Sequence, residues 1–269
     1  MNYPRSVAAN GPAIDSTVAH NARVWDYWLG GKDNFEVDRQ TGDRIREMFP
    51  VISDVAGTSR QFLRRVVRYL AGEAGIRQFL DIGTGLPTAD NTHQVAQDIA
   101  PDSRVVYVDN DPLVLVHARA LLTSNPGGVT DYVDADVHDP AGILAGAART
   151  LDLGRPVAVM MLGILNFVLD DDEARRIVTH LMDAVPGGSY LAVTHPTVEM
   201  HGEMNVPAMA FWNERATPRI RARTRADLAA LLDGLELIEP GLVSCPRWRP
   251  DGSEEPPETP LWAALARKP

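Results

Sequence analysis

Short apolar segments alternate with helix-compatible segments from residue 78 onward, and this alternation constrains the fold more than any other feature of the sequence. The apolar segments hold few polar residues, which is typical of strands in a parallel sheet that helices cover on both faces. We predict strands at 77–83, 103–111, 129–137, 155–165 and 186–195, and helices at 87–100, 111–124, 141–151 and 170–185. Because crossovers between parallel strands are right-handed, the prediction is a doubly wound, mostly parallel, Rossmann-like α/β sheet.

Two regions fall outside this alternation. Residues 1–75 have mostly helical periodicity and are predicted to form an N-terminal helical cap on a domain that spans residues 76–269. Residues 196–223 are rich in Met, Trp and Pro and are predicted to be an irregular insertion. We expect both regions to cover the sheet edge where ligands of doubly wound folds bind. A helix is expected within 224–240, where Thr224 and Asp227 resemble a capping box, and a last strand at 260–268.

The composition excludes some classes of function. The formal net charge is −10, so the surface repels a phosphate backbone and we expect no nucleic-acid partner. Five arginines lie within 215–225, and we interpret them as a solvated loop rather than as an anion clamp. No apolar run has the length of a membrane span, and the single cysteine, Cys245, fits a reducing compartment. We therefore expect a cytoplasmic protein without a membrane partner.

The loop after the first strand, FLDIGTGLPTADNTH at 79–93, has the glycines of a nucleotide-binding loop. Gly83 and Gly85 let the backbone approach a ligand closely, and the helix that follows offers free N–H groups. Two residues argue against a dinucleotide, because Asp81 would repel a pyrophosphate and Thr88 occupies the third glycine position of that motif. A ligand with an ammonium group would instead be attracted to Asp81.

Acidic residues also follow the next two strands. Asp109 ends the second strand, where it can accept two hydrogen bonds from a ribose diol. Asp136 ends the third strand, where it can accept from an adenine amino group while the Val137 N–H donates to a ring nitrogen. An ammonium, a diol and an exocyclic amine together match S-adenosylmethionine. Three neighbours of these positions are further expected cofactor contacts: Thr84, Asn110 and Leu162.

At these motifs the sequence resembles class I S-adenosylmethionine-dependent methyltransferases, with DIGTG, VDNDP, DADV and VPGGSYLAV as the markers. It resembles the actinobacterial S-adenosyl methyltransferase family more closely, in the blocks NARVWDYWLGGKDNFEVD, FLDIGTGLPTADNTHQVAQ, VVYVDNDPLVLVHARALL and DGLELIEPGLV. The resemblance runs from about residue 15 to the C-terminus. It implies a seven-stranded methyltransferase sheet and a bound S-adenosylmethionine, and it does not specify the methyl acceptor.

The N-terminal block supplies candidates for the methionine carboxylate of that cofactor. Arg23 and Tyr27 are four residues apart and share one face of the predicted helix. We expect them to bind the carboxylate, with Asn34 and the backbone of Gly30 and Gly31 completing the contact.

Two residues are candidates for work at the acceptor. The resemblance implies Leu-His-Phe after the fourth strand, whereas this chain has Leu165-Asn166-Phe167. Asn166 can orient a substrate, but asparagine takes no proton at neutral pH. If the acceptor is a hydroxyl or an amine that needs a general base, His195 at the end of the fifth strand is the candidate.

These features predict methyl transfer from S-adenosylmethionine, with S-adenosylhomocysteine as product, to a small and partly hydrophobic acceptor. The insertion is expected to supply apolar side chains to the acceptor pocket: Met204, Met209, Phe211 and Trp212. Two alternatives stand beside this prediction, namely a non-catalytic sensor or scaffold that binds the cofactor and an NAD-dependent oxidoreductase. The histidines are scattered, so no metal site is expected, and no motif specifies the methylated atom or the oligomeric state.

Overall fold

Five parallel strands form the middle of the structure, a computed structural model that describes residues 14–88, 90–121, 126–252 and 254–269. They are β2 (Gln78–Ile82), β3 (Arg104–Asp109), β4 (Val129–Asp134), β5 (Ala158–Leu162) and β6 (Tyr190–Pro196). The strands pair in the order β4-β3-β2-β5-β6, and each begins within a segment that the sequence predicts to be a strand. The predicted doubly wound, mostly parallel sheet is confirmed.

Antiparallel strands complete one side of this sheet. The predicted last strand is β10 (Leu261–Arg267), which pairs antiparallel with β6. On its other side β10 pairs with β8 (Glu236–Leu237) and with β9 (Val243–Ser244). Within the described residues the path β4-β3-β2-β5-β6-β10-β8 contains seven strands, as the family resemblance implies, and β9 lies beside that path.

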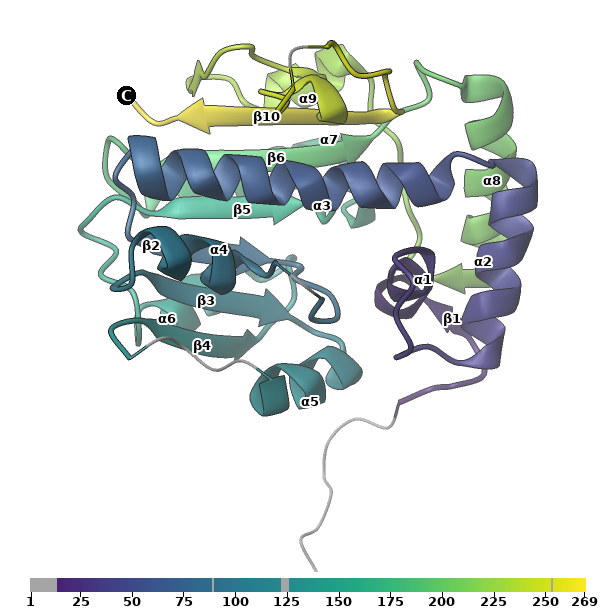
Figure 1. Cartoon of the computed structure of the whole chain (residues 1–269), viewed down its shortest axis with the longest axis horizontal. Helices are drawn as coiled ribbons and strands as arrows, with labels where there is room; N and C mark the ends of the chain where they lie inside the picture. Colours follow the sequence, from purple (N-terminus) through teal and green to yellow (C-terminus); the bar gives the residue numbers. More distant parts are fainter. Residues whose placement is uncertain (1–13, 89, 122–125, 253) are drawn as a thin grey trace, which may run out of the picture.

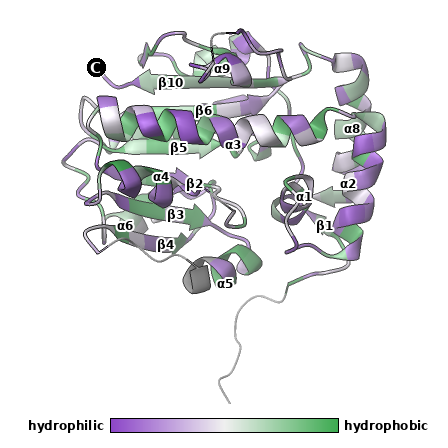
Figure 2. Ribbon diagram, viewed as in Figure 1, coloured by the Kyte–Doolittle hydropathy of each residue, from purple (hydrophilic) through white to green (hydrophobic). Residues whose placement is uncertain are grey.

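Helices cover both faces of the sheet. Successive strand residues point to opposite faces, so each strand contributes side chains to both layers of packing. Phe79 packs in one core with residues of α3 and α4, and Leu80 packs in a second core with residues of α6, α7 and α9. Figure 1 shows α3 crossing the first face, and Figure 2 shows hydrophobic and hydrophilic residues alternating along it. These helices are α3 (Ile52–Arg68), α4 (Thr92–Ile99), α6 (Pro140–Ala147), α7 (Asp171–Asp183) and α9 (Arg225–Leu231). Further elements are α5 (Pro112–Leu121), a π-helical turn (Tyr69–Glu73) and two 3₁₀ turns (Leu165–Phe167 and Cys245–Arg247).

A separate group of elements lies beyond the carboxyl ends of the parallel strands. It contains α1 (Asn21–Trp28), α2 (Glu36–Met48) and α8 (Gly202–Arg215), together with the short parallel pair β1 (Ala19–His20) and β7 (Ala216–Thr217). Figure 1 shows this group on the side toward which the arrowheads of β3, β4 and β5 point. The N-terminal region is helical as predicted from residue 21 onward, and residues 1–13 lie outside the described residues.

The prediction of an irregular insertion at 196–223 is wrong, because α8 is a helix of 14 residues that includes Pro207. Ala208 and Trp212, four residues apart, are buried on one side of α8 and belong to the same core cluster as Ile45 of α2. Packing against α2 therefore stabilises a helix that the local sequence, with its internal proline, does not favour.

Across the described part of the chain, no helix combines the length and the apolar character that crossing a membrane requires.

The assignment of Leu80 to the second core can be tested by truncation. The Leu80→Ala substitution should lower the free energy of unfolding by about 2–5 kcal/mol, because this side chain has no exposed surface and its removal leaves a cavity. Denaturant unfolding followed by circular dichroism measures the change. The matched control is Val116→Ala at an exposed position of α5, which should change stability by less than about 0.5 kcal/mol. Equal losses in the two variants would contradict the assignment.

Candidate functional site

A cavity lies between the carboxyl edge of the sheet and the helices that cover it. Helices α1, α2, α3 and α8 form one side, and the ends of β2, β3, β5 and β6 form the other. Seven of the residues predicted for the site line the cavity: Asp81, Gly83, Thr84, Gly85, Asp109, Leu162 and Asn166. The other predicted residues are not among those that line it: Arg23, Tyr27, Gly30, Gly31, Asn34, Asn110, Asp136, Val137 and His195.

Asp81 is a buried carboxylate at the end of β2. Its Oδ2 accepts a hydrogen bond of 2.7 Å from the Thr92 hydroxyl at the start of α4. Burial raises the pKa of Asp81 from 3.8 to about 6, while the Thr92 hydrogen bond and the nearby Arg60 guanidinium act in the opposite direction. A cationic group bound in the cavity would replace the lost hydration and favour the ionised carboxylate.

Gly83 is required by the close approach of the loop to the turn after β5. Its φ angle is +74°, and a Cβ there would lie 2.5 Å from Ile164 Cδ1. The Gly83 N–H donates to the Val108 carbonyl of β3 at 2.8 Å, which fixes the loop to the neighbouring strand. The Gly83 backbone is therefore held in a position where it lines the cavity.

Asp109 ends β3 with both carboxylate oxygens oriented by backbone donors. Its Oδ2 accepts from the Gly85 N–H at 2.8 Å and its Oδ1 accepts from the Asp111 N–H at 3.0 Å. Each carboxylate oxygen has two lone pairs, so both can accept a further hydrogen bond from a diol. Burial raises the pKa of Asp109, and these two hydrogen bonds oppose that effect.

Asp136 lies beyond this cavity and uses its oxygens locally. Its Oδ2 accepts from the Asn110 side chain at 2.6 Å, and its Oδ1 accepts from the His138 N–H at 2.9 Å. Val137 is buried in the second core. The contact of Asp136 and Val137 with adenine stays a prediction.

The predicted role of Arg23 and Tyr27 is corrected by their positions. The Arg23 guanidinium is buried, pairs with Asp38 Oδ2 at 2.8 Å, and also donates to the Asp15 and Val18 carbonyls. Tyr27 donates its hydroxyl hydrogen to Asp43 of α2 at 2.7 Å. Helix periodicity places both residues on one face, but α2 supplies partners for that face, so it joins two helices instead of meeting the ligand.

In the same block, Asn34 and Gly31 contact Asp26, a residue of the cavity wall, and do not line the cavity themselves. The Asn34 amide donates to Asp26 Oδ2 at 2.8 Å and to the Gly31 carbonyl at 3.1 Å. A Cβ at Gly31 would overlap the Asp26 carboxylate. Asp26 lines the cavity and burial raises its pKa, so this block contributes a carboxylate that the sequence interpretation did not select.

Arg60 is a second lining residue that sequence reasoning missed. It lies on α3, where burial lowers its pKa and the nearby Asp81 raises it. One guanidinium nitrogen donates to the Asp90 carbonyl at 3.1 Å. α3 contains several arginines, and only the orientation of the helix in the structure shows that Arg60 is the one that lines the cavity.

His195 does not face the acceptor side, which corrects its assignment as the base. Its side chain is fully buried, with Nδ1 2.9 Å from the Pro196 carbonyl and Nε2 2.9 Å from Arg223 Nη1. Burial lowers the pKa of His195 to about 4, and the Arg223 charge adds to this effect. Because strand residues alternate in direction, the preceding residue, Thr194, lines the cavity instead.

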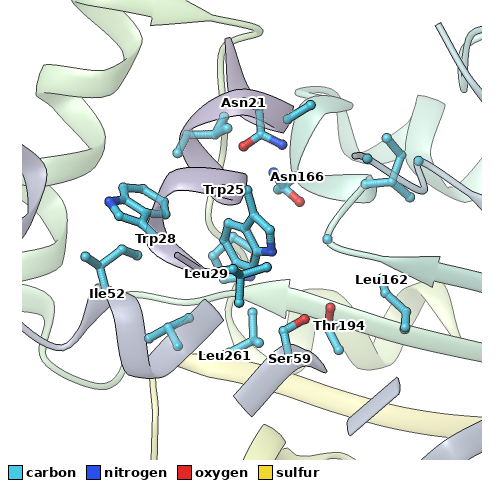
Figure 3. A pocket seen from close by; sticks show the side chains of 18 of the residues that line it. Asn21, Trp25, Trp28, Leu29, Ile52, Ser59, Leu162, Asn166, Thr194 and Leu261 are labelled. Atoms are coloured by element: carbon cyan, nitrogen blue, oxygen red, sulfur yellow. The ribbon is translucent and has the colours of Figure 1, made fainter. Parts of the chain in front are cut away.

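Asn166 and Thr194 each carry a buried polar atom that points into the cavity. Within the described chain, Asn166 Oδ1 and Thr194 Oγ1 have no hydrogen-bond partner. An unpaired buried polar atom costs about 1–3 kcal/mol. Figure 3 shows the Thr194 hydroxyl directed into the cavity and Asn166 among the side chains that line it.

Arg223 holds the turn that carries Asn166. Its guanidinium donates to the Leu165 and Val168 carbonyls at 2.8 Å and pairs with Asp171 at 2.9 Å. The Arg221 N–H donates to the Asn166 carbonyl at 2.9 Å. The arginine-rich segment is therefore not simply the solvated loop that its composition suggests, since part of it is a structural support of the cavity wall.

Aromatic side chains form much of the cavity wall away from Asp81 and Asp109. Trp25 and Trp28 of α1 meet edge to face with ring centroids 5.9 Å apart, and Phe49 and Trp212 also line the cavity. Met209 is on the wall as predicted, whereas Met204 and Phe211 pack against the first core. We call the part of the cavity at the strand tips, with Asp81 and Asp109, the charged end, and the part under α1 and α8, to which α1 also contributes Asp26, the aromatic end.

Comparisons with known proteins give matches over nearly the whole chain. A family model described as S-adenosyl methyltransferase matches residues 7–269. A DUF574 family protein from Streptomyces avermitilis is 45% identical, with 95% of this chain and 99% of that chain covered and a TM-score of 0.90. A candidate methyltransferase from Thermobifida fusca is 41% identical, with 98% and 99% covered and a TM-score of 0.87.

A more distant structure shares the fold alone. Human N-acetylserotonin methyltransferase in complex with S-adenosylmethionine is 14% identical, with 91% of this chain and 62% of that chain covered and a TM-score of 0.51. No curated protein matches the chain.

The raised pKa of Asp81 predicts a pH dependence of ligand binding. An ammonium group binds the ionised carboxylate, so S-adenosylhomocysteine affinity should be full above pH 6 and fall by about tenfold per pH unit below it. Calorimetric titration between pH 5 and pH 8 measures this, and Asp81→Asn should remove the dependence that Asp81 causes. Asp109 is present in both proteins, so the difference between the two profiles belongs to Asp81. Identical profiles would refute the role of Asp81.

The close approach at Gly83 predicts a loss of affinity on substitution. Gly83→Ala should weaken S-adenosylhomocysteine binding about tenfold or more, because the positive φ angle and the overlap with Ile164 force the loop to move. Gly57→Ala is the control, since a Cβ at Gly57 of α3 meets no atom within 4 Å and alanine favours the helix. Unchanged binding by the Gly83 variant would show that the loop tolerates a shift there.

Proposed function

The chain belongs to the S-adenosyl methyltransferase family, and we propose that it transfers the methyl group of S-adenosylmethionine to a small, partly hydrophobic acceptor in the aromatic end of the cavity. The observation that carries the proposal is that one cavity is lined by charged residues at the strand tips and by aromatic residues of α1, α8 and the end of α2. Membership of this family favours an enzyme over a non-catalytic binder and over an NAD-dependent oxidoreductase. The chain is an S-adenosylmethionine-dependent methyltransferase, and the acceptor is the part proposed.

The residues at the charged end fit the cofactor. Asp81 is buried with a raised pKa, which an ammonium group would relieve, and Asp109 presents two oriented oxygens to a diol. Arg60 faces the same space and offers a guanidinium to a carboxylate. We assign the methionine ammonium to Asp81, the ribose to Asp109 and the methionine carboxylate to Arg60, in place of Arg23.

The aromatic end fits the body of the acceptor. Trp25 and Trp28 of α1, Trp212 of α8 and Phe49, which directly follows α2, offer ring surfaces to a flat apolar molecule. The cavity-lining carboxylates are Asp26, Asp81 and Asp109, and an anionic acceptor would meet repulsion from them.

Methyl transfer from S-adenosylmethionine depends mainly on the alignment of the acceptor atom with the methyl carbon. S-adenosylmethionine, when bound, supplies a methyl carbon that its sulfonium already activates. The strand ends hold the cofactor-binding groups in a rigid sheet, and α1, α2 and α8 cover the opposite side of the cavity. This cover excludes water and brings an acceptor to a fixed approach direction, which is the contribution that orientation makes to catalysis.

The assignment of Arg60 can be tested with two ligands that differ in the amino-acid part. Arg60→Met should weaken S-adenosylhomocysteine binding by about 10–100-fold, the loss expected for a charge-assisted hydrogen bond. Binding of methylthioadenosine, which lacks the amino and carboxyl groups, should not change. Asp109→Ala should weaken both ligands, because both carry the ribose. Calorimetric titration provides all values.

Arg64→Met is the matched control, because Arg64 lies one turn further along α3, is exposed, and approaches Asp90 without lining the cavity. It should bind both ligands like wild type. Equal effects of Arg60→Met on both ligands would refute the carboxylate assignment. Failure of wild type to form S-adenosylhomocysteine from S-adenosylmethionine with any small-molecule extract would refute the proposed transfer.

A further inference from the structure

The two buried polar atoms in the cavity wall bear on the chemical class of the acceptor, an inference that rests on the proposed function. Asn166 is 6% exposed and Thr194 has no exposed surface, yet within the described residues Asn166 Oδ1 and Thr194 Oγ1 lack hydrogen-bond partners. Both residues line the cavity. A ligand that donates hydrogen bonds to them would satisfy atoms that the fold leaves unpaired.

The backbone that carries each of these atoms is held in place on both sides. Thr194 is in β6, paired with Leu162 of β5 on one side and with Ala263 of β10 on the other. Asn166 is in a turn whose own carbonyl accepts from the Arg221 N–H, and Arg223 holds the carbonyls of Leu165 and Val168 on either side. The two residues are therefore fixed at the cavity wall.

The chemistry of these atoms selects the ligand group. An amide oxygen accepts hydrogen bonds and never donates, so the group facing Asn166 Oδ1 must carry N–H or O–H. A phenol would have to lose its proton before or during methyl transfer. His195, which follows Thr194, faces the other side of β6, so a cavity carboxylate such as Asp26 would have to accept that proton. An uncharged amine needs no base before transfer, because its lone pair is already available.

We propose that the acceptor is an uncharged, ring-bearing amine whose N–H groups donate to Asn166 Oδ1 and Thr194 Oγ1 while its lone pair faces the transferable methyl group. The ring lies among the aromatic side chains of α1 and α8. In the transfer the nitrogen lone pair forms the new nitrogen–carbon bond, and the electrons of the carbon–sulfur bond pass to sulfur. The nitrogen becomes cationic, and it loses a proton to water after the product leaves.

Three ring compounds of one shape test this class. The probes are indane carrying an amino, a hydroxyl or a methyl group at the same aromatic carbon, titrated into the complex of the full chain with S-adenosylhomocysteine and followed by ligand-detected NMR. The amino compound should bind about tenfold or more tightly than the methyl compound. Asn166→Leu and Thr194→Val should each reduce this preference, and Asn166→Asp, which keeps an acceptor oxygen, should retain it.

Thr197→Val is the matched control, because Thr197 is also fully buried in the chain but its hydroxyl accepts from the Glu199 N–H at 3.2 Å and it does not line the cavity. It should lower the melting temperature and leave the preference unchanged. Thr194→Val should keep or raise the melting temperature, because it removes an unsatisfied hydroxyl. These two shifts separate a ligand-facing threonine from a structural one.

The outcomes separate this inference from the proposed function. Binding of S-adenosylhomocysteine with equal affinity for the amino and methyl probes would overturn the amine class and leave the methyltransferase proposal standing. Methylation of the hydroxyl probe but not the amino probe would also overturn it, and loss of that activity in Asp26→Asn would assign the base. Absence of any S-adenosylhomocysteine binding would overturn the proposed function itself.

Discussion

The parallel alignment of five strands is the constraint on which the rest of this structure depends. Since parallel strands end at the same edge, their register decides which side chains meet there. Ile82 pairs with Val108, which sets Asp81 and Asp109 at neighbouring strand ends, and Leu162 pairs with Thr194 on the other side of β2. The cavity residues of β2 and β3 and those of β5 and β6 therefore lie along one hydrogen-bonded edge, and a slip of one residue in either pair would turn them toward the opposite face.

The open side of that edge is covered by elements that are far apart in the sequence. Asp38 of α2 accepts from Arg23 Nε and from the backbone N–H groups of His20 and Phe35. This buried and fully engaged carboxylate fixes α1 relative to α2, and β1 pairs with β7 at the end of α8. A buried ion pair of this kind gives orientation more than net stability, because desolvation offsets much of the attraction. Here the orientation matters, since α1 carries Trp25 and Asp26 to the cavity.

A second buried charge, Arg223, holds the part of the cavity wall that contains Asn166 and Thr194. Arg223 reaches from the segment before α9 to the turn after β5, to Asp171 at the start of α7 and to His195 in β6. It lies outside the cavity, yet the residues it holds include the neighbours of Asn166 and Thr194. In both regions a buried arginine, Arg23 or Arg223, supports the cavity wall without lining the cavity.

The sequence by itself determined the order of strands and helices and the positions of Asp81, Gly83 and Asp109, because these follow from local periodicity and from the rule that ligands bind at parallel strand ends. It also determined the capping box at Thr224, which involves residues three apart. Only the tertiary structure decided which member of a pair faces the cavity: Thr194 rather than His195, and Arg60 rather than Arg23. It also decided that 202–215 is helical and that Asp26 is buried in the wall. These outcomes depend on partners distant in the sequence, namely Arg223 for His195, Asp38 for Arg23 and α2 for α8, and no local pattern contains that information.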